Sequence, residues 1–296
     1  MDRGPLAERI IQEFDAMPAQ LQSAARYMLE RPSDVALLSM REQARRAGVK
    51  PATMMRLAKR LGLSGYEAAR SLYAEAIRAG GPGFSGRAGR QLASQKAKGD
   101  QALAAEMVGS LRRQLDRMAD PGSLARLVAA AELLVAAERI YCLGLRACYP
   151  IAWNVHYVLS LLGDRTVLLD APAGIGGDQI RSASSRDVLL AISVEPYTRA
   201  TVEMVEYARK RGVAVVGVTD SRLSPLARLA QETILVSVDG PSFFHAMTPA
   251  FLVGEILATL VAGRGGDAAL DALRNTEAQL AAFDVYWNSS ESRRPR

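Results

Sequence analysis

Five short runs of apolar residues follow one another after Arg139, and segments with helical periodicity separate most of them. Because these runs lack the alternation of a half-exposed strand, they indicate strands buried on both faces. Strands of this kind that alternate with helices predict a parallel sheet with helices on both sides. The fold class expected is therefore α/β, with a doubly wound five-stranded parallel sheet in the C-terminal half. The five runs are Arg139–Leu145, Thr166–Asp170, Asp187–Ser193, Val213–Thr219 and Thr233–Val238.

The first 79 residues have a different pattern, with apolar residues at helical spacing and breaks at Pro18 and Pro32. This pattern predicts an all-α domain over residues 1–79. A glycine-rich stretch, Gly80–Gly99, reads as a linker or a frayed helix start, and a helical region up to about residue 124 reads as a connecting helix. Residues 125–285 then form the sheet domain, which includes tail helices near His245–Gly263 and Asp267–Asp284, and residues 286–296 form a tail.

The basic residues of the chain are concentrated in its first third. Residues 1–100 carry a formal charge of +7, whereas residues 101–296 carry −1. Within Arg41–Arg60 there are seven basic residues and one acidic residue, Glu42. A local basic face beside a neutral remainder is typical of a module that binds a polyanion, although a solvated helix surface has the same charge.

The pattern of residues beneath this charge favours a helix-turn-helix. Ala44 is small enough for two helices to approach closely, and Gly48 suits the left-handed turn that redirects the chain. Pro51 suits the first position of the second helix, which presents its early residues to the major groove of DNA. We expect Thr53 and Arg56 to contact base edges. The remaining predicted DNA contacts, mainly to phosphates, are Arg41, Arg45, Lys50, Lys59 and Arg60.

In open parallel sheets, ligands bind beyond the carboxyl ends of the strands. Three of the predicted strands end in turns that are rich in hydroxyl, glycine or charged residues and lead toward helices. The helix amides and hydroxyls of such turns can hold an anion, although a hydroxyl there is as often an ordinary helix cap. The candidate ligand-binding residues are Gly144, Arg146, Cys148, Ser193, Glu195, Tyr197, Thr198, Thr219 and Ser221.

Taken together, these motifs resemble the RpiR family of bacterial transcriptional regulators, which join an N-terminal helix-turn-helix to a sugar isomerase (SIS) domain. The resemblance covers about residues 6–79 and 125–262. It is carried by Ala44–Gly48, Ala52-Thr53, Arg56, Lys59–Gly62 and Gly65-Tyr66, and by Thr219–Ser221 with Ser224–Ala227 in the second half. The resemblance implies a ligand-responsive regulator whose partners are a double-stranded DNA operator and a sugar phosphate or related carbohydrate derivative.

The chain departs from the family pattern around the expected ligand. Arg146 stands where a second glycine is usual, and Cys148 replaces a serine. In the second signature, usually Ser-x-Ser-Gly-x-Thr, Glu195 and Pro196 replace the inner Ser-Gly. Because Pro196 has no amide hydrogen and Glu195 repels a phosphate, these departures predict a modified effector pocket.

Composition narrows the remaining possibilities. No run of about 18 uncharged apolar residues occurs, so we expect no membrane partner. Two cysteines and two histidines predict neither a disulfide framework nor a zinc site, and with no secretory signal in view they favour the cytoplasm. No cofactor is expected. A homodimer or homotetramer is expected, because a single recognition helix gives weak specificity.

Two other functions stay open at this point. An SIS-type sugar-phosphate isomerase needs a positioned base, and His245, Glu195 and Glu255 are candidates. His156 lies on a mostly apolar face of a predicted helix, which is typical of a histidine in the core. An adaptor that binds a protein through its helical segment is the third possibility, and it predicts no salt-dependent affinity for DNA.

Overall fold

The computed structural model describes residues 5–78, 83–170 and 177–287. Contacts divide the chain into two compact units: Met1–Leu115 with Ser237–Ala246, and Asp116–Val236 with Met247–Arg296. Each unit is described by itself.

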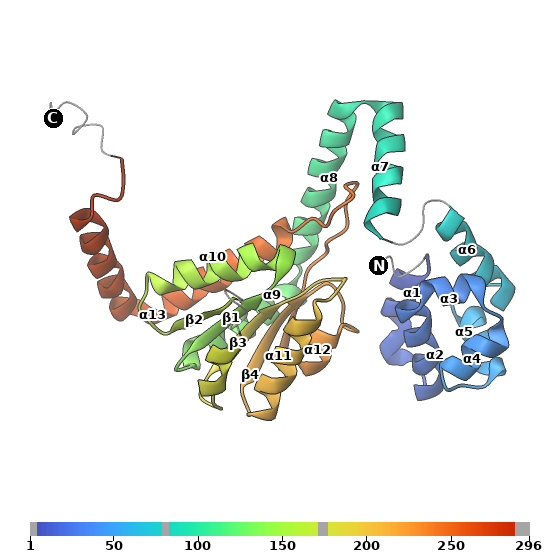
Figure 1. The fold of residues 1–296 in the computed structure, drawn as a ribbon, viewed down its shortest axis with the longest axis horizontal. Coiled ribbons are helices and arrows are strands. Elements are labelled where there is room, and N and C mark those ends of the chain that lie inside the picture. The colour runs from blue at the N-terminus through green and yellow to red at the C-terminus, as the bar shows by residue number, and fades with distance from the viewer. Residues whose placement is uncertain (1–4, 79–82, 171–176, 288–296) are drawn as a thin grey trace. The chain divides into compact units, whose positions relative to one another are not determined.

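The N-terminal part of the first unit is entirely helical, as predicted (Figure 1). Pro18 precedes the second helix, and Pro32 takes the first position of the short third helix, where its missing N–H costs nothing. The helices are α1 (Ala7–Glu13), α2 (Ala19–Glu30), α3 (Pro32–Leu37), α4 (Met40–Arg46), α5 (Pro51–Arg60) and α6 (Tyr66–Arg78), with a 3₁₀ turn at Phe14–Ala16.

The glycine-rich stretch that was predicted as a linker or a frayed helix start is largely helical. Helix α7 covers Phe84–Lys98, and α8 covers Asp100–Met118 after a turn at Gly99, whose φ is 88°. Residues 79–82 lie outside the described residues. Segment Ser237–Ala246 packs with this helical pair: the Gln91 side chain accepts a hydrogen bond from the Phe243 N–H at 2.8 Å, and Gln114 donates to the Asp239 carbonyl.

The second unit contains the predicted five-stranded, all-parallel sheet, and its strand order is β2-β1-β3-β4-β5. Register pairs such as Tyr141 with Leu189 and Leu189 with Val215 align the three central strands. Every residue of β1 and β3 is buried, which explains their continuous apolar sequence. The strands are β1 (Ile140–Gly144), β2 (Thr166–Leu169), β3 (Val188–Ile192), β4 (Ala214–Thr219) and β5 (Glu232–Leu235).

Helices cover both faces of the sheet, so the doubly wound architecture is confirmed (Figure 1). One face is covered by α9 (Pro121–Ala136), α10 (Tyr149–Ser160) and the first part of α13 (Thr248–Ala282). The other is covered by α11 (Arg199–Lys210) and α12 (Pro225–Leu229), which close a core containing Tyr141, Leu189, Val205, Val215 and Leu226.

Two predicted helices differ in detail. The two tail helices form one element, α13, with a kink at Gly266, where φ is 54° and ψ is −136°. The helix expected near Ile175–Ser184 is a 3₁₀ turn at Asp178–Ser182, and residues 171–176 lie outside the described residues. None of the described helices combines the length and the hydrophobicity that a bilayer span requires.

Candidate DNA-binding and effector sites

The turn between α4 and α5 has the geometry that its glycine predicts. Gly48 has a φ of 65°, and a side chain there would meet no atom within 4 Å, so the glycine is required by backbone conformation rather than by space. The Val49 N–H donates to the Ala44 carbonyl at 2.9 Å, which closes the end of α4. At the other end of α4, the Ser39 hydroxyl accepts from the Glu42 N–H at 3.3 Å, as expected of a cap.

Helix α5 is strongly amphipathic. Met54, Leu57 and Ala58 are fully buried against neighbouring helices, and Lys50 precedes the helix without a side-chain cap. The exposed residues of the opposite face recur at helical spacing: Ala52, Met55, Arg56 and Lys59.

One predicted DNA contact was placed wrongly. Thr53 was expected on the outer face of α5, but its residue is only 2% exposed. The physical reason is helical phase: Thr53 lies next to Met54 and one turn before Leu57, so it shares the buried face. Met55, which is exposed, lies on the outer face where Thr53 was expected. Because methionine is apolar, the sequence alone suggested that it was buried.

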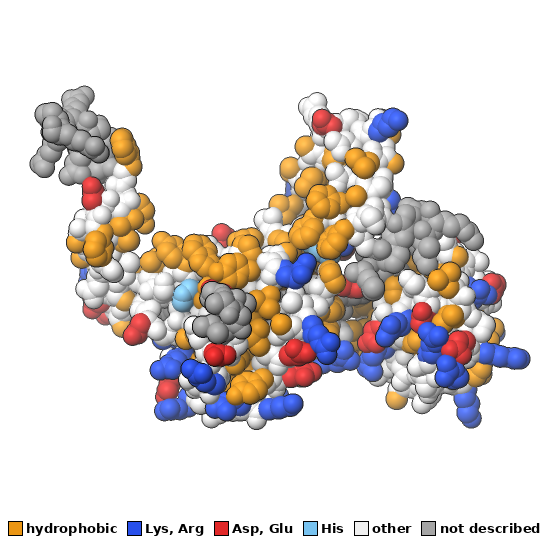
Figure 2. Space-filling model, in the orientation of Figure 1, with side chains coloured by type: hydrophobic (Ala, Val, Ile, Leu, Met, Phe, Trp, Pro, Cys, Tyr) orange, Lys and Arg blue, Asp and Glu red, His pale blue; other side chains and the backbone are white. Residues whose placement is uncertain are grey.

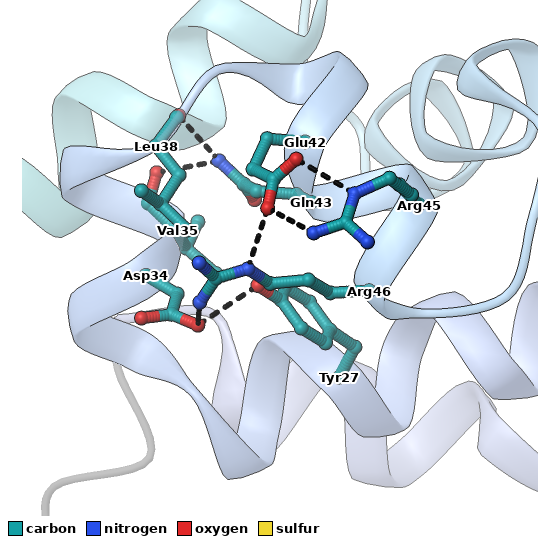
Figure 3. A network of polar contacts seen from close by, with 8 residues as sticks. All are labelled: Tyr27, Asp34, Val35, Leu38, Glu42, Gln43, Arg45 and Arg46. Atoms are coloured by element: carbon teal, nitrogen blue, oxygen red, sulfur yellow. Dashed lines mark hydrogen bonds and ion pairs between the residues drawn. The ribbon is translucent and has the colours of Figure 1, made fainter.

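The other predicted DNA contacts are all exposed, but two of them are paired with a carboxylate. Arg41, Lys50, Arg56 and Lys59 are exposed. Arg60 is exposed too but pairs with Glu13 at 2.9 Å. Arg45 lies in a polar network with Glu42 (Figure 3).

Figure 3 shows how that network holds α4. The Glu42 carboxylate accepts hydrogen bonds from Arg45 at 2.6 Å and Arg46 at 2.9 Å, and these bonds hold its pKa down at about 2. Arg46 also donates to Asp34 at 3.0 Å. Beneath them Gln43, which is fully buried, donates to the carbonyls of Val35 and Leu38.

In the second unit, the turn after β1 is tight. An added Cβ at Gly144 would lie 2.5 Å from the Cys148 carbonyl oxygen, so no other residue fits there without moving the backbone. Arg146 has a φ of 56°, in the left-handed region that glycine prefers. The side chain at this position therefore replaces a glycine without changing the glycine-type backbone.

The ends of β1, β3 and β4 converge on Asp220. The Tyr197 hydroxyl donates to Asp220 Oδ1 at 3.0 Å, and the Thr219 hydroxyl lies 3.4 Å from the same oxygen. Burial raises the pKa of the Cys148 thiol to about 11, a hydrogen bond with the backbone of Val194 opposes the rise, and the negative charge of Asp220 adds to it. Asp220 is thus a central residue that sequence reasoning passed over, although it lies between two of the predicted residues.

The remaining predicted ligand residues have varied surroundings. Ser193 is 2% exposed and continues the β3–β4 pairing through its backbone N–H. Ser221 is also buried, and its hydroxyl accepts from the Leu223 N–H at 3.1 Å, which is a turn-forming role. Glu195 and Thr198 are half-buried, and Thr198 precedes α11 without capping it through its side chain.

The histidines considered for isomerase chemistry have different surroundings. His245 stacks against Arg87, with both ring nitrogens 3.3 Å from the guanidinium, and lies edge-on to Phe84. Burial lowers the pKa of His156, which is half-buried within α10. Among the described residues, no group of three potential metal ligands occurs.

Comparison with known proteins agrees with this architecture. The SIS domain family matches residues 133–260, and these contain all five strands. HexR, an HTH-type transcriptional regulator of Pseudomonas aeruginosa, is 26% identical over 276 residues, which are 88% of this chain and 90% of that protein. An uncharacterised HTH-type transcriptional regulator of Caldanaerobacter subterraneus is 25% identical over 267 residues, 87% of this chain and 90% of that protein.

The chain contains an SIS domain, and most of its length is similar to HTH-type transcriptional regulators. The fold agrees with two solved structures. The sugar isomerase domain of an RpiR transcription factor from Sphaerobacter thermophilus has a TM-score of 0.53 and 24% identity, over 60% of this chain and 97% of that one. The Vibrio vulnificus NanR protein, in a complex with ManNAc-6P, has a TM-score of 0.55 and 22% identity, over 96% of this chain and 100% of that one. The similarity thus joins an N-terminal helical domain to an SIS domain in the same order as in these regulators.

Proposed function

We propose that this protein is a transcriptional regulator of the RpiR family, which binds an operator through the exposed face of α5 and changes its affinity for that operator when a small molecule occupies the SIS domain. The observation that carries the proposal is the arrangement of α5. Its apolar face is sealed into the helical domain, whereas Lys50, Arg56 and Lys59 are exposed directly after the Gly48 turn.

Base reading is assigned to Arg56, whose guanidinium can bind the two acceptor atoms of a guanine edge in the major groove. Lys50, Lys59 and Arg41 would bind phosphates and set the register of the helix on the duplex. Arg45 and Arg60 would have to exchange their carboxylate partners, Glu42 and Glu13, for phosphate, so they contribute less affinity.

The effector site is assigned to the carboxyl ends of β1, β3 and β4, around Cys148, Tyr197 and Asp220. The ManNAc-6P in the NanR complex supports a sugar phosphate or a related carbohydrate derivative as the effector class. The carboxylates of Asp220 and Glu195 favour ligand hydroxyl or amino groups at this end of the site, because these groups donate hydrogen bonds to carboxylates. Pro196 has no N–H and so offers no backbone donor to an anionic ligand group.

Regulation would follow from a population shift. An effector that binds one arrangement of two subunits better than another changes the spacing of their α5 helices, and so changes operator affinity. In this proposal the protein acts in the cytoplasm as a homodimer or homotetramer. We assign no catalytic step to the chain.

The decisive experiment measures DNA binding of the purified full chain to genomic fragments, with the salt concentration varied. Arg56→Ala should abolish the specific footprint, whereas Arg209→Ala, at an exposed position in α11, should leave it unchanged. Equal footprints from both variants would contradict the assignment of Arg56. An affinity that does not depend on salt would favour the adaptor alternative.

The effector assignment has a separate test. A thermal-shift screen with sugar phosphates, acid sugars and amino sugars should reveal a compound that raises the melting temperature and alters operator affinity. Turnover of a sugar phosphate, lost on His245→Ala, would instead support the isomerase alternative.

A further inference from the structure

The last part of α13 and the residues after it leave an unusual amount of aromatic surface exposed. We define the C-terminal arm as residues 267–287, which follow the kink at Gly266. Phe283, Tyr286 and Trp287 of the arm are 72%, 65% and 85% exposed. Isolated exposed apolar residues are ordinary, but contiguous patches of this kind usually mark an interaction surface.

A second apolar surface lies on α10 of the same unit. Trp153 and Tyr157, one helical turn apart, are 45% and 41% exposed. Their rings stack with centroids 5.4 Å apart and an interplanar angle of 2°, and so form a flat aromatic platform. Figure 2 shows hydrophobic side chains gathered along α10 and again along the arm. Because both surfaces remain exposed in one chain, the arm does not cover the platform of its own copy.

The middle of the arm is nevertheless tied to the end of α10. The Thr276 hydroxyl donates to the carbonyl of Leu161, directly after the last turn of α10, at 3.0 Å. A two-fold axis beside α10 would therefore bring the arm of each copy to the platform of the other, and the interface would be isologous. The arm has a formal charge of −3, because it carries Asp267, Asp271, Glu277 and Asp284 but only Arg274. Trp153 and Tyr157 are uncharged, so the platform residues themselves do not repel the arm.

The exposed rings alone supply an area that reaches the lower part of the range for stable dimers. At about 150–250 Å² for each aromatic side chain, the three exposed fractions correspond to roughly 300–550 Å² of open surface on one arm. By the same estimate the Trp153–Tyr157 platform exposes roughly 130–215 Å², so two arms docked reciprocally on two platforms would bury roughly 900–1,500 Å² of ring surface in total. Stable protein interfaces bury about 1,200–2,000 Å².

We propose that the C-terminal arm of one copy docks on the Trp153–Tyr157 platform of a second copy of this chain, so that the SIS units are joined by exchanged arms. The occupant of both surfaces is thus the same protein, and the dimer would pair two recognition helices. The proposal does not depend on DNA binding or on the effector.

Two variants, each with one added cysteine, test the contact directly. Trp153→Cys and Trp287→Cys, purified separately and mixed under mild oxidation, should give a disulfide-linked species of twice the chain mass on a non-reducing gel. The native Cys142 and Cys148 are both buried, so they do not compete. Tyr207→Cys, which changes an exposed aromatic residue of α11, is the matched control and should give no such band with Trp287→Cys.

A second measurement shows whether a cross-link reports a stable dimer or only a random encounter between two copies in solution. In sedimentation analysis at micromolar concentration, the full chain should be at least a dimer, and Phe283→Ser with Trp287→Ser should lower the apparent mass, with an unchanged circular dichroism spectrum. The proposal is overturned if the two cysteine variants fail to cross-link, if the Tyr207→Cys control links equally well, or if the arm variant keeps the wild-type mass.

Discussion

The phenolic hydroxyl of Tyr66 in α6 donates a hydrogen bond to the side-chain oxygen of Gln43 in α4, and both side chains are buried. Gln43 in turn donates to the carbonyls of Val35 and Leu38 at 3.1 and 2.8 Å. One amide therefore links α3, the α3–α4 junction and α6 beneath the recognition helix. The helix-turn-helix is held by a satisfied polar group as well as by its apolar core.

Tyr66→Phe should destabilise the N-terminal domain by about 1–3 kcal/mol, because the Gln43 oxygen would remain buried without a donor. Urea unfolding followed by circular dichroism measures the change. Tyr207→Phe, at a 42% exposed position, should alter the free energy of unfolding by less than about 0.5 kcal/mol. Equal effects from the two variants would show that the buried hydrogen bond contributes nothing.

The turn glycine can be tested against a helix glycine. Gly48→Ala should destabilise the domain by about 1–2 kcal/mol through backbone strain alone, since the new methyl group has open space. Gly89→Ala, within α7 and also in open space, should stabilise by about 0.5–1 kcal/mol, because alanine favours the helix. Thermal unfolding of both variants should therefore shift in opposite directions.

The corrected phase of α5 gives a prediction about DNA. Thr53→Val should leave operator affinity within about twofold, because the side chain is buried. Lys59→Ala should instead reduce the slope of log affinity against log salt by about 0.9, the value for one lost phosphate contact on duplex DNA. Fluorescence anisotropy over a salt series measures both. A large loss of affinity with Thr53→Val, in a protein of unchanged stability, would restore Thr53 as a DNA contact.

Arg146 has a left-handed backbone conformation, so a glycine substitution can distinguish its backbone strain from its role in ligand binding. Arg146→Gly should stabilise the SIS domain by about 0.5–1 kcal/mol, because glycine adopts a φ of 56° without steric cost. Arg209→Gly, in the last turn of α11, should destabilise by about 1 kcal/mol instead. If Arg146 contributes charge to the effector, the glycine variant will also bind the effector more weakly while melting at a higher temperature.

The buried thiol of Cys148 predicts a pH dependence. Its pKa is raised to about 11, whereas an unfolded cysteine titrates near 8.5. Between these values the folded state retains a proton that the unfolded state loses, so stability should fall as the pH rises from about 8.5 to about 11. Comparison of Cys148→Ala with the wild type in urea at pH 8 and pH 10 isolates this contribution. A difference between the two proteins that does not change with pH would contradict the shift.

Much of the architecture followed from periodicity alone. Continuous apolar runs predicted the parallel strands, and the spacing of Ala44, Gly48 and Pro51 predicted the turn and the start of α5, because these are local properties of the backbone. The glycines of Phe84–Lys98 were misleading: they weaken a helix but do not forbid one, and packing of α7 with Ser237–Ala246 offsets their cost.

The sequence by itself determined most of the elements, including all five strands, and the segments that contribute to each site. Only the tertiary structure decided which side chains meet. It moved Thr53 to the buried face of α5, placed Asp220 between the ends of β1, β3 and β4, and paired Arg60 with Glu13. The physical reason is that propensity and periodicity act over a few neighbouring residues, whereas burial and hydrogen bonding depend on residues that are distant in the chain and adjacent only after folding.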